Sequence, residues 1–134
     1  MIIGIGHDIC DQRRIGAVFD RFGVRFSARI LTPDEQAELQ GRKNKQAYLA
    51  GRFAVKEAVY KALAAADQAK MRWHHAATLS RKNGAPLLIL SDACLAGATA
   101  LLPPGHSLKL HVSLSDEPPY SSAFVVLSAE QETE

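Results

Sequence analysis

The chain has 134 residues, of which 47% are hydrophobic, and its formal net charge at pH 7 is only +2. This length suits one domain with a buried core, so we expect a single domain over residues 1–134 with a flexible tail over 129–134. The small net charge argues against a general nucleic-acid binder, and every apolar run is far shorter than the roughly 20 residues of a membrane span.

The N-terminal third predicts a strand followed by two helices. Ile2 to Gly6 is short, apolar and β-branched, and we place Asp8 at or just past the end of this strand, facing a cleft or solvent. Apolar residues recur at helical spacing from Gln12 to Phe22, which predicts an amphipathic, basic helix. Thr32-Pro33-Asp34-Glu35 supplies a capping threonine, a proline and a glutamate at the third position, which predicts a helix that runs to about Gly41.

The middle of the chain predicts a long helix, a hairpin and a short helix. Gln46 to Ala66 is rich in alanine, leucine and lysine, which favours one long helix. Trp73 to Ser80 and Leu87 to Leu90 flank Asn83-Gly84, a strong turn signal, and predict two antiparallel strands. Ser91 to Leu102 is alanine-rich, which predicts a short helix that stops at the following prolines.

The C-terminal part predicts a second pair of strands, Leu108 to Ser115 and Ser121 to Ser128. The first of these alternates apolar and polar residues, as a half-buried strand does, so His111 should point away from the core. Strands and helices in this order predict an α+β fold, in which an antiparallel sheet is layered with a long central helix and shorter helices.

Two features bear on the cellular compartment. Cys10 and Cys94 lack a C-x-x-C spacing and a secretory context, which favours reduced thiols. The first six residues lack the basic start and the cleavage site of a secretory signal. We therefore expect a cytoplasmic protein.

Acidic and basic residues at helical spacing could carry chemistry. Glu57 and Lys61 are four residues apart, so they share one face of the long helix. Such a pair is usually a solvated salt bridge, and an aspartate after a strand, like Asp8, often only caps a turn. Brought together, however, Asp8 and Glu57 would supply the hard oxygen ligands that Mg²⁺ prefers, and Lys61 would neutralise charge on a phosphate.

Charge is unevenly distributed along the chain. Between residues 13 and 29 there are five arginines and one acid, Asp20, whereas three of the last five residues are glutamates and none is basic. This segregation indicates a local acidic partner.

Two motifs resemble those of the 4′-phosphopantetheinyl transferases. Members of this superfamily carry Gly-x-Asp at the end of the first strand and Phe/Trp-x-x-Lys-Glu-x-x-x-Lys on a helix, and this chain has Gly6-His7-Asp8 and Phe53 to Lys61 at the expected separation. Further agreement with the short, single-unit carrier-protein synthases covers nearly the whole chain. It includes Ile3 to Ile15, Arg29 to Thr32, Ala50 to Arg52, Gly84 to Pro86 and His111 to Ser115.

The resemblance implies an activity, a cofactor and roles for the motif residues. The enzyme would move phosphopantetheine from coenzyme A to a serine of apo-acyl carrier protein and release 3′,5′-ADP, for fatty acid biosynthesis. Asp8 and Glu57 would hold Mg²⁺, and Lys61 would contact the pyrophosphate and assist the leaving group. Either Glu57 or a metal-bound water would accept the serine proton.

The resemblance also implies binding residues and an assembly. Coenzyme A would contact Lys61, Pro86, His111, Lys43 and Lys45, although lysines in such a polar stretch are usually only solvated. The acidic helix of the carrier protein would dock on four arginines: Arg14, Arg21, Arg25 and Arg29. The short members are homotrimers with sites at the subunit interfaces, and we expect the same here.

The chain departs from the family pattern at two places. Many relatives have a Gly-Thr-Gly stretch after the helix lysine, where this chain has Ala64-Ala65-Ala66-Asp67, which puts coenzyme A affinity or the pose of its pyrophosphate in doubt. His7 stands where an apolar residue or threonine is more familiar. Two alternatives stay open: a transferase for a polyketide or peptide-synthetase carrier domain, and a non-catalytic relative that only binds coenzyme A or a carrier.

Overall fold

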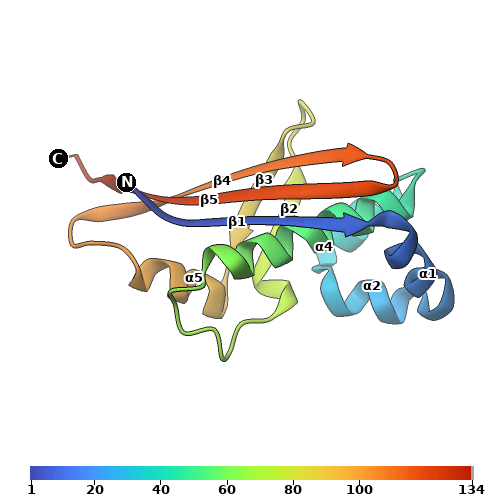
Figure 1. The fold of residues 1–134 in the computed structure, drawn as a ribbon, viewed down its shortest axis with the longest axis horizontal. Coiled ribbons are helices and arrows are strands. Elements are labelled where there is room, and N and C mark those ends of the chain that lie inside the picture. Colours follow the sequence, from blue (N-terminus) through green and yellow to red (C-terminus); the bar gives the residue numbers. More distant parts are fainter. Residues whose placement is uncertain (134) are drawn as a thin grey trace.

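The computed structural model describes residues 1–133 and shows two antiparallel sheets with helices on one side of the larger one (Figure 1). The larger sheet has the order β1-β5-β4, in which β1 spans Ile2–Asp11, β5 spans Tyr120–Gln131 and β4 spans His106–Glu117. Buried and exposed residues alternate along all three strands. One face of the sheet therefore packs on the core, and we call the opposite face the outer face.

The central helix α4 (Lys45–Ala62) lies against the inner face of this sheet, next to β1 and β5 (Figure 1). Glycines permit the close approach. A Cβ added at Gly6 would collide with the carbonyl oxygen of Ala58, and one added at Gly4 would collide with that of Ala62. The backbone of β1 thus lies directly on α4, which brings any polar group on the inner face of β1 within reach of the helix.

Three short helices precede α4: α1 (Gln12–Phe22), α2 (Val24–Ile30) and α3 (Pro33–Gln40). The predicted start of α3 is confirmed, because Thr32 and Glu35 form a capping box with each other's backbone. α2 was not predicted from the sequence. Its start depends on Gly23, whose φ of 58° turns the chain sharply between the two helices.

The smaller sheet is a hairpin of β2 (Ala76–Ser80) and β3 (Pro86–Leu90), which projects from the body of the molecule (Figure 1). A short 3₁₀ turn, η1 (Trp73–His75), precedes it, and α5 (Asp92–Ala100) follows it. The antiparallel pairing confirms the predicted hairpin.

The α+β fold class is confirmed, whereas several predicted boundaries are wrong. β1 continues through Asp8 to Asp11 because it stays paired with β5 as far as Tyr120, the partner of Asp11. The long helix ends at Ala62 rather than Ala66, where Leu63 donates back to carbonyls of the last turn and the chain enters a series of turns. β5 continues to Gln131, so the first three residues of the expected flexible tail belong to a strand.

Cys10 and Cys94 are both unpaired thiols within the described part of the chain. None of the helices in residues 1–133 combines the length and the apolar character that a bilayer crossing requires.

Candidate active site

Asp8 and Lys61 meet where β1 crosses the C-terminal half of α4. Asp8 pairs with Ala123 in the sheet, and it therefore lies on the inner face, toward the helix, rather than in a cleft past the end of the strand. Lys61 Nζ donates to Asp8 Oδ1 at 3.0 Å and to the carbonyl oxygen of His7 at 3.0 Å. The carboxylate is largely shielded by this arrangement, since the Asp8 side chain is 15% exposed.

Glu57 lies one turn before Lys61 on the same helix and belongs to the same electrostatic cluster. Burial and the nearby negative charge of Asp8 raise the pKa of Glu57 above its ordinary value of 4.5, against the smaller opposing effects of Lys61 and Arg14. Two carboxylates that repel each other favour a cation between them. The predicted trio of Asp8, Glu57 and Lys61 is thus brought together in space.

The donor chemistry of this cluster fits Mg²⁺. Mg²⁺ takes hard oxygen ligands and often uses only one or two protein carboxylates, with water and substrate phosphate in the other positions. Asp8 and Glu57 provide two such carboxylates. Within residues 1–133 no group of three or more His, Cys, Asp or Glu gathers as a metal site, so a cage made only of protein ligands is not present there.

The other basic residue of the helix motif, Lys56, has a structural role. Its ammonium is buried and donates to Glu35 Oε1 at 2.9 Å and to the carbonyl oxygens of Trp73 and Ala76. Glu35 also accepts from the backbone N–H of Thr78 at 3.0 Å. Lys56 and Glu35 therefore join α3 and α4 to the segment that leads into the hairpin.

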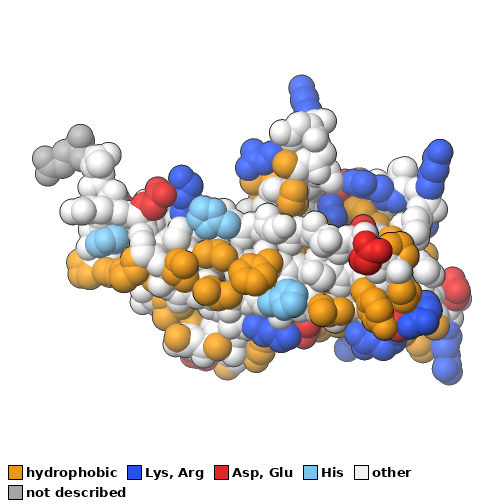
Figure 2. All heavy atoms as spheres, turned by 45° about the horizontal axis from the view of Figure 1, so that its top comes forward, with side chains coloured by type: hydrophobic (Ala, Val, Ile, Leu, Met, Phe, Trp, Pro, Cys, Tyr) orange, Lys and Arg blue, Asp and Glu red, His pale blue; other side chains and the backbone are white. Residues whose placement is uncertain are grey.

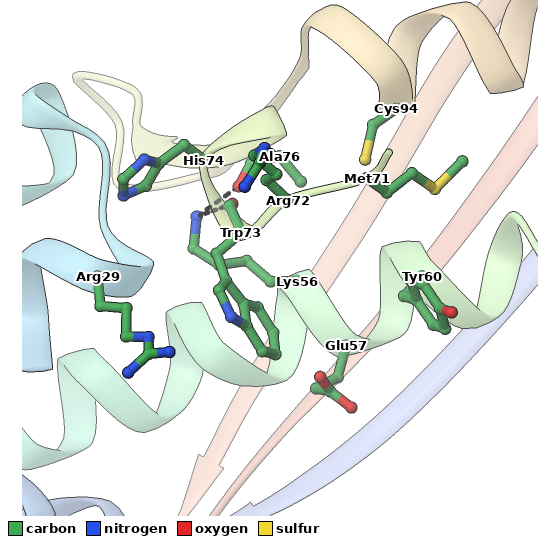
Figure 3. Close-up of a pocket in the computed structure, with 10 residues that line it drawn as sticks. All are labelled: Arg29, Lys56, Glu57, Tyr60, Met71, Arg72, Trp73, His74, Ala76 and Cys94. Carbon is green, nitrogen blue, oxygen red and sulfur yellow. Dashed lines mark hydrogen bonds between the residues drawn. The ribbon is translucent and has the colours of Figure 1, made fainter. Parts of the chain in front are cut away.

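Aromatic residues form a wall beside Glu57. Phe53 and Trp73 stack with their ring centroids 5.3 Å apart, and the Arg14 guanidinium lies 5.8 Å from the Phe53 centroid. A cavity of about 570 Å³ opens between this wall and α5 (Figure 3). In addition to Glu57 and Trp73, its lining includes Tyr60, Met71 and Cys94.

The four predicted docking arginines are exposed, on α1 and α2. Arg14 is close enough to lower the pKa of Glu57, and Arg29 lines the cavity beside it. Arg21 lies over the ring of Phe22, and Arg25 is exposed on α2. The structure thus brings Arg14 and Arg29 to the carboxylate cluster, while Arg21 and Arg25 extend the basic surface away from it.

The predicted coenzyme A residues are more dispersed within one chain. His111 is on the outer face of the sheet, where its Nε2 lies 3.0 Å from Ser128 Oγ, so the sheet separates it from Asp8. Pro86 begins β3 on the hairpin. Lys43 lines a second cavity of about 380 Å³ with Arg42 and Leu114.

Lys45 caps a helix in this structure. Its Nζ donates to the carbonyl oxygens of Leu39, Gln40 and Arg42, at 2.9 to 3.3 Å, which satisfies the C-terminal end of α3. The altered segment after Lys61 is also held internally. Gln68 donates its side-chain amide to the carbonyl oxygen of Tyr60, and Asp67 accepts from the N–H of Ala69.

Sequence reasoning missed the Glu35, Arg52 and Trp73 contacts around the site. Arg52 donates to Glu38 and to the carbonyl oxygen of Thr78, and so fastens the hairpin to α3. The available sequence signal for Arg52 and Glu35 was a charged residue at a helix position that the pattern of apolar neighbours places on the buried face. Trp73 could not have been placed, because its partner Phe53 is distant in sequence.

The motif cluster and the fold together define a phosphopantetheinyl transferase. The model of the 4′-phosphopantetheinyl transferase superfamily matches residues 4–113, and the chain belongs to this superfamily. Two curated relatives are the holo-[acyl-carrier-protein] synthases of Methylobacterium sp. (strain 4-46), 45% identical, and of Agrobacterium fabrum (strain C58), 40% identical; each match covers 96% of this chain and 96% of the relative. Within the superfamily, the chain therefore belongs to the holo-[acyl-carrier-protein] synthase family of transferases.

Solved structures agree with this assignment. The crystal structure of holo-[acyl-carrier-protein] synthase from Neisseria meningitidis superimposes with a TM-score of 0.79 at 34% identity, over 98% of this chain and 100% of that one. The Helicobacter pylori enzyme, solved in complex with coenzyme A, has a TM-score of 0.75 at 29% identity, over 92% of this chain and 99% of that one.

Proposed function

We propose that the chain transfers 4′-phosphopantetheine from coenzyme A to a serine of apo-acyl carrier protein, releases 3′,5′-ADP and so serves fatty acid biosynthesis. The meeting of Asp8, Glu57 and Lys61 between β1 and α4 carries the proposal, because these groups suit the charge changes of phosphoryl transfer. The relatives support the same function, since they are named holo-[acyl-carrier-protein] synthases and the Helicobacter pylori enzyme was solved with coenzyme A.

Mg²⁺ held by Asp8 and Glu57 would neutralise developing charge on the phosphate oxygens. Lys61, on the same side of the helix, places its ammonium beside Asp8 and contributes a second positive charge toward the departing phosphate. Glu57 is one proposed acceptor of the serine proton, because its carboxylate lies beside Asp8 and Lys61, where the phosphate would react. A water molecule is the alternative proton acceptor.

The proposed assembly is a homotrimer in which neighbouring copies share each site. Hydrophobic side chains gather on the outer face of the sheet (Figure 2), and Ile5, Ile9 and Phe124 there are about half exposed. Such an apolar face on a sheet favours contact with a second copy. His111 supports the same assembly, because from the outer face it can reach coenzyme A only if a neighbouring copy holds the ligand.

The assembly has a direct test in light scattering. Ile5→Asp would place a charge on the outer face without touching the inner one, so it should yield monomers and lose transfer activity. Ile89→Asp is the matched control, since Ile89 is a similarly exposed strand residue on the separate hairpin. A wild-type chain that is an active monomer would contradict the proposal.

The remaining coenzyme A contacts are proposed for Lys43 and Pro86. Lys43 lies with Arg42 on the second cavity, where two positive charges suit a phosphate of the nucleotide end. Lys45 was also predicted to contact coenzyme A. Its three carbonyl partners favour a capping role instead, so we expect Lys45→Ala to lower stability more than coenzyme A affinity.

Arg14, Arg21, Arg25 and Arg29 form the proposed docking surface for the acidic helix of the carrier protein. Exposed positive charges accelerate association with an acidic partner and make it sensitive to salt. The two unpaired thiols, Cys10 and Cys94, agree with a cytoplasmic location, which is where we expect the enzyme to encounter the carrier protein.

One experiment separates the proposed function from its alternatives. Release of 3′,5′-ADP is measured with a fatty acid carrier protein and with a polyketide or peptide-synthetase carrier domain as acceptors. We expect a higher kcat/KM on the fatty acid carrier. Faster release with the other carriers would favour the first alternative, and no release with either acceptor, despite coenzyme A binding, would favour the non-catalytic one.

A further inference from the structure

The outer face of the larger sheet is apolar only in part. Where β4 pairs with β5 it also carries a polar strip, which consists of Lys109 and His111 from β4 and of Ser128 and Glu130 from β5. Histidine and charged side chains lie beside the hydrophobic ones on this face (Figure 2). The polar strip therefore borders the apolar residues through which the copies are proposed to associate.

The polar strip follows the register of the two strands with a constant offset. In the sheet His111 is the partner of Val126, yet its Nε2 lies 3.0 Å from Oγ of Ser128, two residues further along β5. Lys109 is the partner of Ser128, and its Nζ lies 3.3 Å from Oε1 of Glu130, which is again two residues further. Diagonal neighbours of this kind are within reach of long side chains. The contact between His111 and Ser128 thus belongs to a regular pattern of the sheet.

This pattern leaves the hydroxyl of Ser128 to His111. Lys109 stands directly opposite Ser128, but its ammonium pairs with Glu130 instead. A hydroxyl partner also differs from a carboxylate, which would favour the charged imidazolium over the neutral ring. Because Ser128 carries no charge, it allows His111 to act as a neutral imidazole.

The hydrogen bond to Ser128 decides which ring nitrogen meets a ligand. A hydroxyl can donate or accept, and in either role it occupies Nε2 of His111, so Nδ1 is the nitrogen that faces a ligand. The nucleotide end of coenzyme A offers mainly acceptors, which are phosphate oxygens and the ring nitrogens of adenine. A ring that binds them carries its proton on Nδ1, and Nε2 then accepts from the hydroxyl of Ser128.

We propose that Ser128 is a positioning residue for coenzyme A binding: its hydroxyl donates to Nε2 of His111 and fixes the neutral tautomer whose Nδ1 donates to the nucleotide end of a coenzyme A held by a neighbouring copy. The inference rests on the proposed function and deepens it, because it states how His111 is oriented. His111 is exposed in a single copy, so the bond to Ser128 is what restricts the rotation of its ring before the ligand arrives.

The first test is the kinetics of transfer with varied coenzyme A. Ser128→Ala should raise the KM for coenzyme A about three- to tenfold and leave kcat within about twofold, since about one net hydrogen bond of uniform binding is lost. Ser128→Thr keeps a hydroxyl and should restore the wild-type KM. Ser122→Ala is the matched control, because Ser122 is on the same face of β5 near its other end. An unchanged KM in Ser128→Ala, or a loss of kcat in its place, would overturn the proposal.

A double-mutant cycle tests whether Ser128 acts through His111. His111→Ala should raise the KM for coenzyme A at least as much as Ser128→Ala does, and Ser128→Ala should add nothing to it in the double variant. Additive effects would overturn the proposal. Light scattering should show the wild-type oligomeric state for Ser128→Ala, whereas a dissociated variant would mean that Ser128 serves the assembly rather than His111.

The tautomer has its own readout in NMR spectra of protein labelled with ¹⁵N in histidine, at about pH 8, where imidazoles are mostly neutral. The signals of His111 are those absent from the spectrum of His111→Ala. With 3′,5′-ADP bound, we expect the wild type to carry the proton on Nδ1, and Ser128→Ala to populate both tautomers. A wild-type ring with its proton on Nε2 would overturn the proposal.

Calorimetric titration with 3′,5′-ADP separates this inference from the proposed function, because it requires no transfer. Transfer by the wild type, together with equal 3′,5′-ADP affinity of the wild type and Ser128→Ala, would refute the inference and keep the function. Weaker 3′,5′-ADP binding by Ser128→Ala, without transfer by either protein, would keep the inference and refute the function.

Discussion

Replacement of Lys56 by methionine tests whether this motif lysine is structural rather than catalytic. Methionine keeps the apolar length of the side chain and removes the ammonium. Glu35 then loses the partner at 2.9 Å that compensates its charge, and the carbonyl oxygens of Trp73 and Ala76 lose their donor. Both side chains of the pair are at most 2% exposed, so water cannot replace these contacts without rearrangement.

Breaking one partner of such a buried pair costs about 3–5 kcal/mol in the free energy of unfolding. The pair Lys61–Asp8, one turn further along α4, has a similar separation of 3.0 Å, but its lysine is 53% exposed. Its loss should cost at most about 1 kcal/mol. Lys61→Met is therefore a matched control for Lys56→Met, on the same helix and with the same substitution.

Urea denaturation at fixed protein concentration measures both variants, since stability depends on concentration if copies associate. We also expect Glu35→Gln combined with Lys56→Met to lose at least about 1 kcal/mol less than the sum of the two single variants. A cost for Lys56→Met equal to that of Lys61→Met would refute the structural role of Lys56.

Three further predictions concern packing, titration and docking. Gly6→Ala should lower the free energy of unfolding by about 1–3 kcal/mol, because the added Cβ collides with the carbonyl oxygen of Ala58. Gly41→Ala is the control and should have little effect, since a Cβ there makes only an ordinary contact. Equal costs for the two variants would contradict the close packing of β1 on α4. The raised pKa of Glu57 means that protons compete with Mg²⁺ at a higher pH than at an ordinary glutamate. The pH at which the affinity measured by calorimetry has halved should therefore lie above 4.5, and Lys61→Met should raise it further because it removes a charge that lowers the pKa of Glu57. A twofold loss that is reached only at or below pH 4.5 in both proteins would contradict competition between protons and Mg²⁺ at a Glu57 of raised pKa. Arg21→Glu should slow association with the carrier protein more at low than at high salt in stopped-flow measurements, and an equal effect at all salt concentrations would argue against electrostatic docking.

Local signals in the sequence predicted most elements of the fold. The capping residues Thr32 and Glu35 determine where α3 begins, and alternation identified the strand around His111. The misplaced boundaries depend on partners distant in sequence. β1 reaches Asp11 because β5 pairs with it. α2 begins after a backbone turn at Gly23, which the spacing of apolar residues does not indicate.

The site too was predicted only in part, because some of its contacts are local in sequence and others join distant segments. Glu57 and Lys61 lie on one helix, so their spacing alone places them on one face. Their proximity to Asp8 came from the family resemblance, and its physical basis is the pair of glycines that lets β1 lie on α4. The structural roles of Lys45 and Lys56 depend on backbone carbonyls from other segments, which sequence patterns do not reveal.

Transfer of phosphopantetheine at the site of Asp8 and Glu57 is tested by intact-mass spectrometry of apo-acyl carrier protein after incubation with this protein, coenzyme A and Mg²⁺. Asp8→Ala and Glu57→Ala are run in parallel, together with a sample containing a chelator. We expect a gain of one phosphopantetheine group with the wild type, which either substitution or the chelator abolishes. A gain that persists in both variants would contradict the assigned site, and no gain on any carrier from a folded, coenzyme A-binding protein would contradict the function itself.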